Sequence, residues 1–314
     1  MDEGLGGLQG DRRDFLRQVG IMTSAAAVAG GLGAAEASPT ANEGALPTIR
    51  LGEHRVTRLI AGYNPVGGFS HATPNLSQHM RNYFTVERTV DFLRHCEAQG
   101  INAFQFDLSE KTEKALEILR EGGTHLRFIC LHSERSRYAS LEEVMAHQPI
   151  AVAHHGGVTD SLFRDGKAQQ VHDYVKRTHD LGALACVSSH NPAHIARMAD
   201  EGWENDFFMA CFYHLSRTRE EMERELGFAT VGEPFLESDP EKMTAVIRQI
   251  DKPFLAFKIL AAGRRCANEK AVASAFKRAF EQIKKTDAVI VGMYPAFQDE
   301  VSQNVALAKQ YGSV

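Results

Sequence analysis

The sequence predicts a (β/α)8 barrel (TIM barrel), in which eight parallel strands alternate with eight helices. Three observations lead to this prediction. Short apolar runs alternate with amphipathic segments between Val56 and Tyr311, as expected for buried parallel strands and their covering helices. Eight strand–helix pairs account for this stretch, and one barrel of this type takes about 250 residues. Histidines follow four of the predicted strands and a lysine follows a fifth, at the end where barrels place their active sites.

Each predicted element has a local signal in the sequence. The predicted strands are the apolar runs 56–60, 101–108, 126–131, 150–153, 183–187, 206–212, 254–260 and 288–291. The predicted helices are 85–100, 110–120, 140–145, 173–181, 192–202, 242–250, 269–285 and 299–311. Ser109 and Pro192 are typical helix starts, and Gly100 and Gly202 are typical helix ends. The long connection that ends near Phe84 is either a lid over the pocket or a surface excursion.

The first 37 residues have the features of an export signal in the usual order. Arg12 and Arg13 precede an apolar Ala/Gly-rich stretch, which ends at the small-x-small pattern Ala35-Glu36-Ala37. The apolar stretch is too short for a membrane span of about 20 residues. The segment resembles a twin-arginine (Tat) signal peptide. The alternative is a disordered N-terminus with a chance arginine pair.

This resemblance implies an address and a domain organisation. We expect the Tat export machinery as a partner, a periplasmic or other extracytoplasmic location, and no stable membrane span after removal of residues 1–37. Residues 38–48 are then a polar linker and residues 49–314 the barrel. The Tat route exports folded proteins, often with a cofactor already inserted. It therefore also fits an exported chain with unpaired cysteines.

Composition excludes several classes of function. The 314 residues include 35 Lys and Arg against 40 Asp and Glu, without a basic run inside the predicted domain, so nucleic acid is not an expected partner. The five cysteines have no paired motif spacing, which argues against a disulfide framework and against a cysteine-bound metal. The expected ligand is a small-molecule substrate.

Several segments resemble the aldo-keto reductase family. The matching segments are 99–104 (QGINAF), 182–191 (GALACVSSHN), 253–263 (PFLAFKILAAG) and 289–305, the last around a Gly-Met and a Gln-Asn pair. The resemblance implies the barrel fold, a nicotinamide nucleotide (NAD(P)) and oxidoreductase activity on a small carbonyl or sugar-like substrate. It places Ser188, Ser189 and Asn191 at the carboxamide of the nucleotide. It places Arg264, Arg265 and Asn304 near the phosphates, which suit the paired donors of arginine.

The sequence departs from this family where the catalytic groups should be. Gln105 stands at the position of the family's aspartate, with Asp107 two residues later, and no tyrosine occurs between Gln105 and Arg120. His132 falls near the position of the family's lysine. The family's histidine corresponds to His154 or His155. Standard carbonyl reduction, in which a tyrosine with a lowered pKa donates the proton, is therefore not supported.

The remaining catalytic candidates are polar residues at strand ends. They are Asp107, His132, His154, His155 and Lys258. Lys258 either forms a Schiff base, if burial lowers its pKa, or neutralises an anion of the substrate or cofactor. Asp107 is either a general base or a helix cap.

Two alternative functions stay open. A divalent metal is one, because imidazole and carboxylate ligands suit Zn, Mn or Fe; its candidate ligands are His132, Glu134, His155, His190 and His214. Such a site would run hydrolase, isomerase or lyase chemistry. The other alternative is a barrel that binds a ligand without catalysis.

Overall fold

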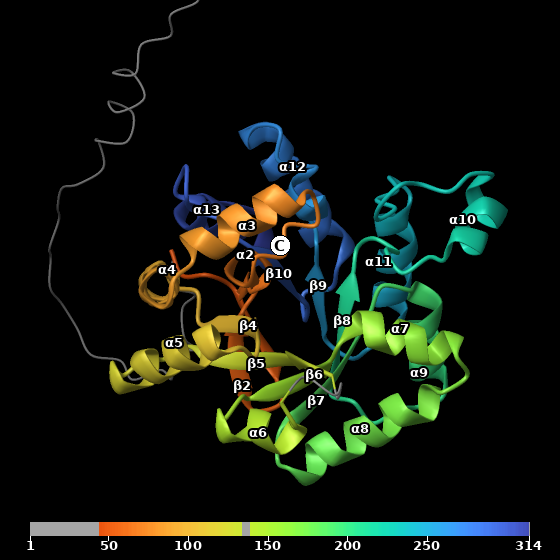
Figure 1. Ribbon diagram of the computed structural model, residues 1–314, viewed down its shortest axis with the longest axis horizontal. Coiled ribbons are helices and arrows are strands. Elements are labelled where there is room, and N and C mark those ends of the chain that lie inside the picture. Colours follow the sequence, from red (N-terminus) through yellow and green to blue (C-terminus); the bar gives the residue numbers. More distant parts are fainter. Residues whose placement is uncertain (1–43, 134–138, 314) are drawn as a thin grey trace, which may run out of the picture. The chain divides into compact units, whose positions relative to one another are not determined.

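The protein forms a closed parallel barrel of eight strands, as the sequence predicts (Figure 1). The computed structural model describes residues 44–133 and 139–313, which belong to one compact unit. The barrel strands are β3 (Leu59–Gly62), β4 (Ala103–Asp107), β5 (Arg127–His132), β6 (Ala151–His154), β7 (Leu184–Ser189), β8 (Phe207–Cys211), β9 (Phe254–Phe257) and β10 (Ala288–Gly292). Every pairing is parallel, and β10 pairs with both β9 and β3, so the sheet has no free edge.

Helices follow the strands and cover the outside of the barrel (Figure 1). They are α2 (Asn64–Gly67), α3 (Pro74–Tyr83), α4 (Val86–Ala98), α5 (Glu110–Glu121), α6 (Leu141–Ala146), α7 (Gly156–Arg164), α8 (Ala168–Asp180), α9 (Pro192–Asp200), α10 (Arg219–Leu226), α11 (Asp239–Gln249), α12 (Glu269–Gln282) and α13 (Glu300–Gly312), with a 3-10 turn η1 (Ala261–Gly263) after β9. No helix within residues 44–133 and 139–313 is long and apolar enough to span a membrane.

A short antiparallel hairpin precedes the barrel and was not predicted. It consists of β1 (Thr48–Leu51) and β2 (His54–Thr57), and its apolar residues pack with the interior residue Ile60 of β3. The predicted bounds of the first barrel strand, 56–60, were therefore displaced, because Val56 belongs to the hairpin and the barrel strand begins at Leu59. Arg58 joins the two parts by donating to the carbonyl oxygens of Asp287 (2.7 Å) and Gly312 (2.6 Å).

Alternation along each strand decides which residues face the barrel interior. Ile129, Ala151, Ala153 and Cys186 belong to the apolar cluster that fills the barrel. Cys130, Val152 and Val187 belong to the second cluster, between the strands and the helices. Because side chains of a strand alternate between its two faces, residues two apart share a face. This parity decides which of the predicted strand-end residues point into the barrel.

Three predicted connections contain helices. The connection after β3 holds α2 and α3, and α3 begins where Thr73 accepts a hydrogen bond from the Leu76 amide. Helix α7 begins directly at Gly156, and α10 begins at a capping box formed by Thr218 and Glu221. Helices α2, α3 and α7 lie in stretches whose glycines and prolines were interpreted as turns. The predicted signal peptide, residues 1–37, and most of the linker lie outside the described residues.

Candidate active site

A buried hydrogen-bond network centres on the carboxylate of Asp160, on α7 beside the end of β7. Its side chain is fully buried. Oδ1 accepts from the Ser189 hydroxyl (2.5 Å) and from Nδ1 of His194 (3.0 Å). Oδ2 accepts from the backbone amide (3.0 Å) and Nδ1 (2.9 Å) of His190. Four donors therefore satisfy one buried carboxylate, as a charge at such a position requires.

These contacts fix the tautomers of both histidines. His194 donates from Nδ1 to Asp160, and its Nε2 accepts from the Asn191 side-chain amide at 3.2 Å. His190 also donates from Nδ1, but its Nε2 has no hydrogen-bond partner among residues 44–133 and 139–313. A neutral His190 therefore carries its lone pair on Nε2. His194 completes the network, and His190 is the histidine that can exchange a proton.

The same contacts set the charge of the carboxylate. Burial alone would raise the pKa of Asp160, but the hydrogen bonds from His190, His194 and Ser189 outweigh it and hold this pKa well below its usual range. Asp160 thus stays ionised. An ionised carboxylate at Nδ1 orients the imidazole of His190 and stabilises its protonated form.

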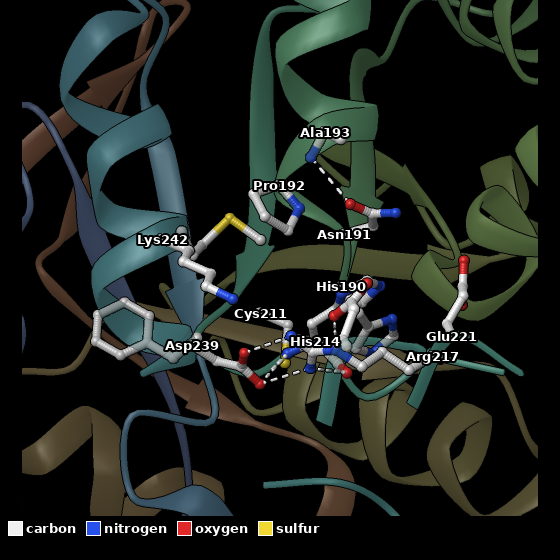
Figure 2. A pocket seen from close by; sticks show the side chains of 13 residues that line it. His190, Asn191, Pro192, Ala193, Cys211, His214, Arg217, Glu221, Asp239 and Lys242 are labelled. Carbon is white, nitrogen blue, oxygen red and sulfur yellow. Dashed lines mark hydrogen bonds and ion pairs between the residues drawn. The ribbon is translucent and has the colours of Figure 1, made fainter. Parts of the chain in front are cut away.

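A pocket opens beside His190 at the carboxyl ends of the strands, with a volume of about 300 Å³ (Figure 2). Its lining includes Asn191 at the start of α9, Cys211 at the end of β8, and His214 just beyond. Burial, together with the nearby charge of Arg217, lowers the pKa of His214 to about 4. His214 is therefore neutral at pH 7. The pocket thus places the neutral imidazole of His214 beside His190 in its lining.

One wall of the pocket is a rigid ion pair. Arg217 donates from its two terminal nitrogens to the two oxygens of Asp239, at 2.9 and 2.7 Å, and both side chains are almost fully buried. Asp239 also accepts from the His214 amide at 3.1 Å. This bidentate pair holds the start of α11 against the connection that carries His214. Lys242 extends from α11 along the same pocket (Figure 2).

Lys258 follows β9 at the same end of the barrel. Its Nζ lies 5.3 Å from the ring centroid of Phe257, and the ring of His190 packs edge-on against the same Phe257 at 5.6 Å. Glu233, from the connection between α10 and α11, interacts electrostatically with both Lys258 and His190. His71, from the connection after β3, hydrogen-bonds Glu233 at 2.9 Å. The predicted lid segment therefore does meet this region.

His132 and His154 do not point into the barrel, contrary to the predicted catalytic role. They are paired in register on β5 and β6, on the outer face of the sheet. His132 hydrogen-bonds the Tyr174 hydroxyl of α8 at 2.6 Å, and its Nε2 donates to the Ala139 carbonyl at 2.8 Å. His154 bonds Thr159 at 2.8 Å and packs edge-on against Tyr174. Both histidines thus contact the covering helices, because their positions have the outward parity.

Asp107 and His155 have the inward parity. Asp107 ends β4, and burial raises the pKa of its carboxyl to about 6. His155 is half-buried and directly precedes α7. Strand β4 is four strands from β8 around the barrel, so Asp107 belongs to the opposite side of the mouth from the pocket.

The residues predicted to hold a nucleotide are mostly engaged within the protein. Asn191 caps α9 by accepting from the Ala193 amide at 2.9 Å, and Ser189 donates to Asp160. Arg264 lies over the Phe235 ring at 3.9 Å, and Arg265 donates to the Tyr213 hydroxyl at 2.8 Å. The other two residues predicted to contact the nucleotide are buried: Ser188 at an inward position of β7, and Asn304 on α13. Arg264 also donates to the Ala261 and His71 carbonyls, and Arg265 to Glu237, so both arginines already have partners within the protein.

The histidines proposed as metal ligands do not form one cluster. Within residues 44–133 and 139–313, no group of three or more His, Cys, Asp or Glu side chains is placed to hold a metal ion. His132 faces α8, whereas His190 and His214 line the pocket. Glu134, the carboxylate of the proposed set, lies outside the described residues.

Asp160 and His194 were missed in the sequence. Asp160 lies in a stretch that was taken as a turn after the Gly156-Gly157 pair. A signal was present, because Thr159, Asp160 and Phe163 fall on one buried helical face. A carboxylate on the apolar face of a helix, directly after a strand that ends in two histidines, indicates a buried polar partner.

Comparisons with known proteins give only structural similarities at low sequence identity. No protein-family model and no curated protein matches the sequence. A glycerol dehydrogenase from Gluconobacter oxydans, an aldo-keto reductase, is 12% identical and has a TM-score of 0.46, with 84% of this chain and 95% of that chain covered. The dihydropteroate synthase of Xanthomonas albilineans is 12% identical with a TM-score of 0.48, covering 86% and 97%. A probable 2-pyrone-4,6-dicarboxylic acid hydrolase from Acinetobacter baumannii is 11% identical with a TM-score of 0.42, covering 73% and 82%. The chain has the (β/α)8 barrel fold.

Proposed function

We propose that this protein is an enzyme that performs acid–base chemistry on a small carbonyl or sugar-like substrate, with His190 as the proton-transferring group. One observation carries the proposal: the buried Asp160 carboxylate holds His190 through two hydrogen bonds, while Nε2 of His190 has no partner in the described part of the chain. A base needs a fixed orientation, a defined tautomer and an open lone pair. His190 has all three.

The surroundings of His190 support a small polar substrate with a carbonyl group. The pocket beside His190 holds about 300 Å³, which suits a small polar molecule. Removal of a proton next to a carbonyl group leaves negative charge on the carbonyl oxygen, and a nearby cation stabilises that charge. Lys258 contacts the Phe257 ring that His190 also contacts, and its amine can meet this need either as a cation or through a covalent bond to the carbonyl carbon. We therefore assign proton abstraction beside a carbonyl as the reaction class.

The redox form of this function remains a prediction of the family resemblance. NAD(P) phosphates would have to compete with the hydrogen bonds that Arg264 donates to the Ala261 and His71 carbonyls and that Arg265 donates to Tyr213 and Glu237. Because the present arrangement does not fit the nucleotide, the proposed mechanism contains no hydride-transfer step. Calorimetric titration with NADH and NADPH tests this prediction directly, since submillimolar affinity would restore the oxidoreductase interpretation.

Proton exchange in deuterated water tests the acid–base function. The purified protein is incubated with glycolaldehyde, glyceraldehyde and dihydroxyacetone, and the loss of the proton signal beside the carbonyl is followed by NMR. We expect enzyme-dependent exchange that falls about 10²- to 10⁴-fold in His190→Gln, the range for losing a general base. His95→Gln, at an exposed histidine on α4, is the matched control. Exchange that is absent with every probe, or equal in His190→Gln and the wild type, would contradict the proposal.

A further inference from the structure

Lys258 occupies an unusual backbone conformation at the end of β9. Its φ is +59°, and Ala261 and Ala262 both have a φ of +50°. Side chains other than glycine rarely adopt this left-handed region, and strain of this kind persists only where the surrounding structure holds it. A continued strand would turn Lys258 to the outer face. The left-handed turn ends the strand and leaves the side chain beside Phe257, whose own position has the inward parity.

The amine of Lys258 lacks the partners that other partly buried lysines have. Lys111 donates to the Phe84 carbonyl at 3.0 Å, Lys252 to the Asn205 carbonyl at 2.6 Å, and Lys284 to the Ile247 carbonyl at 2.8 Å. Within residues 44–133 and 139–313, Nζ of Lys258 makes no hydrogen bond and no ion pair. Lys258 is partly buried, and its amine is therefore free to bind a ligand at the mouth of the barrel without first breaking a contact within the described residues.

The environment makes this amine a nucleophile. Burial lowers the pKa of Lys258, and the nearby carboxylate of Glu233 offsets this only in part. A larger share of the side chain is therefore neutral at pH 7 than for a solvated lysine. A neutral amine carries the lone pair that attacks a carbonyl carbon. His190 contacts the same Phe257 ring, and Glu233 interacts electrostatically with both His190 and Lys258, so the proposed base and the amine belong to the same region of the barrel mouth.

We propose that Lys258 forms a Schiff base with an aldehyde or ketone substrate, an inference that rests on the carbonyl substrate of the proposed function. Nζ bonds to the carbonyl carbon, and the carbonyl π electrons move to oxygen, which takes up a proton as nitrogen loses one. The resulting hydroxyl takes a second proton and leaves as water, which gives a protonated carbon–nitrogen double bond. His190 then removes a proton from the neighbouring carbon, and the electron pair moves into the iminium to form an enamine.

The Schiff base gives the two groups complementary tasks. The iminium is a stronger electron sink than the free carbonyl, so a base of ordinary strength suffices for the second step. His190 is held by Asp160 at Nδ1 and uses Nε2, whereas Lys258 contributes a covalent bond. The competing role for Lys258, a cation that binds a substrate oxygen without a covalent bond, predicts no adduct.

Reductive trapping tests the proposal on the full-length protein. The protein is incubated with one equivalent of glycolaldehyde, glyceraldehyde or dihydroxyacetone, and sodium borohydride is then added. Intact mass and peptide mapping locate any adduct, which adds the mass of the carbonyl compound less one oxygen atom. We expect at least tenfold more adduct at Lys258 than at Lys111, Lys252 or Lys284. No adduct at Lys258 with any probe, or equal labelling of all lysines, overturns the Schiff base.

Two variants separate the interpretations. Lys258→Arg keeps the positive charge and cannot form the adduct, so it should lose trapping at this position while its circular dichroism spectrum matches that of the wild type. Lys270→Arg, at an exposed position of α12, should leave trapping at Lys258 unchanged. If proton exchange depends on His190 but no adduct forms, the Schiff base is contradicted and the acid–base function is not. If an adduct forms at Lys258 but no proton exchange occurs, the acid–base function is contradicted and the Schiff base is not.

Discussion

His190 binds Asp160 twice, through its backbone amide at 3.0 Å and its side-chain Nδ1 at 2.9 Å. The two bonds converge on one oxygen, so they fix both the backbone that follows β7 and the plane of the imidazole. Ser189 and His194 occupy the other oxygen. Rotation of either histidine would leave a buried acceptor without its donor. The network therefore couples the stability of the β7–α9 connection to the position of the proposed base.

Replacement of Asp160 by Asn should weaken both folding and function. The amide removes the charge and turns its own N–H donors toward buried histidine N–H groups. We expect a loss of about 3 kcal/mol in the free energy of unfolding, as for a broken buried charge network. Proton exchange should fall at least tenfold. Urea unfolding and NMR exchange measure the two effects.

The matched control is Asp165→Asn, at the exposed C-terminal end of the same helix. A surface substitution of this kind should change the stability by less than about 0.5 kcal/mol. If Asp160→Asn and Asp165→Asn behaved alike, Asp160 would not be the centre of the network.

The barrel was predictable from the sequence, but the orientation of its strand-end residues was not. All eight barrel strands lie within or beside a predicted apolar run, because buried parallel strands carry continuous apolar sequence. The first strand was displaced because Val56 belongs to a hairpin whose residues are equally apolar. His154 and His155 differ by one position, and that single step moves a side chain from α8 to the mouth. Only the register of neighbouring strands resolves such a choice.

Some of the residues singled out in the sequence lie at one pocket, although the roles predicted for them stay predictions. His190, Asn191 and His214 line the pocket, and Lys258 lies near His190. The role of Asp160 could not be predicted from the local sequence pattern, because its hydrogen bond to His190 joins α7 to the β7–α9 connection. A hydrogen bond between segments this far apart in the sequence becomes visible only once the barrel is folded.

Tyr174→Phe should separate structure from chemistry at His132 and His154. Loss of the hydroxyl removes a 2.6 Å hydrogen bond to the buried His132, while the ring that packs against His154 remains. We expect a cost of about 1–2 kcal/mol in unfolding free energy, typical of a lost buried hydrogen bond. Proton exchange per folded molecule should stay within twofold of the wild type. A large loss of exchange with intact folding would return these histidines to the catalytic site.

Asp107 should make folding depend on pH between about 4 and 6. Burial raises its pKa to about 6 in the folded protein, above the value of about 4 for an unfolded chain. The folded state therefore binds the proton more tightly, so this contribution is fully present below pH 4 and is lost as the pH rises through 6. Asp107→Asn removes it.

The stability difference between wild type and Asp107→Asn measures this contribution. Between pH 4 and pH 7 the stability of the wild type should fall relative to that of Asp107→Asn by about 2–3 kcal/mol, because one pKa unit corresponds to about 1.4 kcal/mol. Asp91→Asn, at an exposed position of α4, should show no such shift. A flat difference for Asp107→Asn would mean that its carboxyl is fully solvated.

The predicted export signal can be tested without reference to the barrel. A fusion of residues 1–48 to a folded fluorescent reporter should reach the periplasm of cells with a functional Tat pathway. The double substitution Arg12→Lys and Arg13→Lys should retain the reporter in the cytoplasm. Fractionation of both strains gives the result. Equal export in cells that lack the Tat pathway would contradict this address.

Gly156→Ala should displace His190 without removing any polar group. A Cβ at this position would lie 2.9 Å from the Ser188 hydroxyl and 3.1 Å from Cε1 of His190, closer than side chains normally approach. Alanine otherwise favours a helix over glycine by about 0.5–1 kcal/mol, so any destabilisation reports the clash. Relief of this clash should move the His190 imidazole, and a misplaced base should reduce the rate of proton exchange by about tenfold or more. Gly157→Ala is the matched control, because its Cβ would meet only the His155 side chain, at 3.3 Å. If Gly156→Ala exchanged protons as fast as Gly157→Ala, the position of His190 would not govern the reaction.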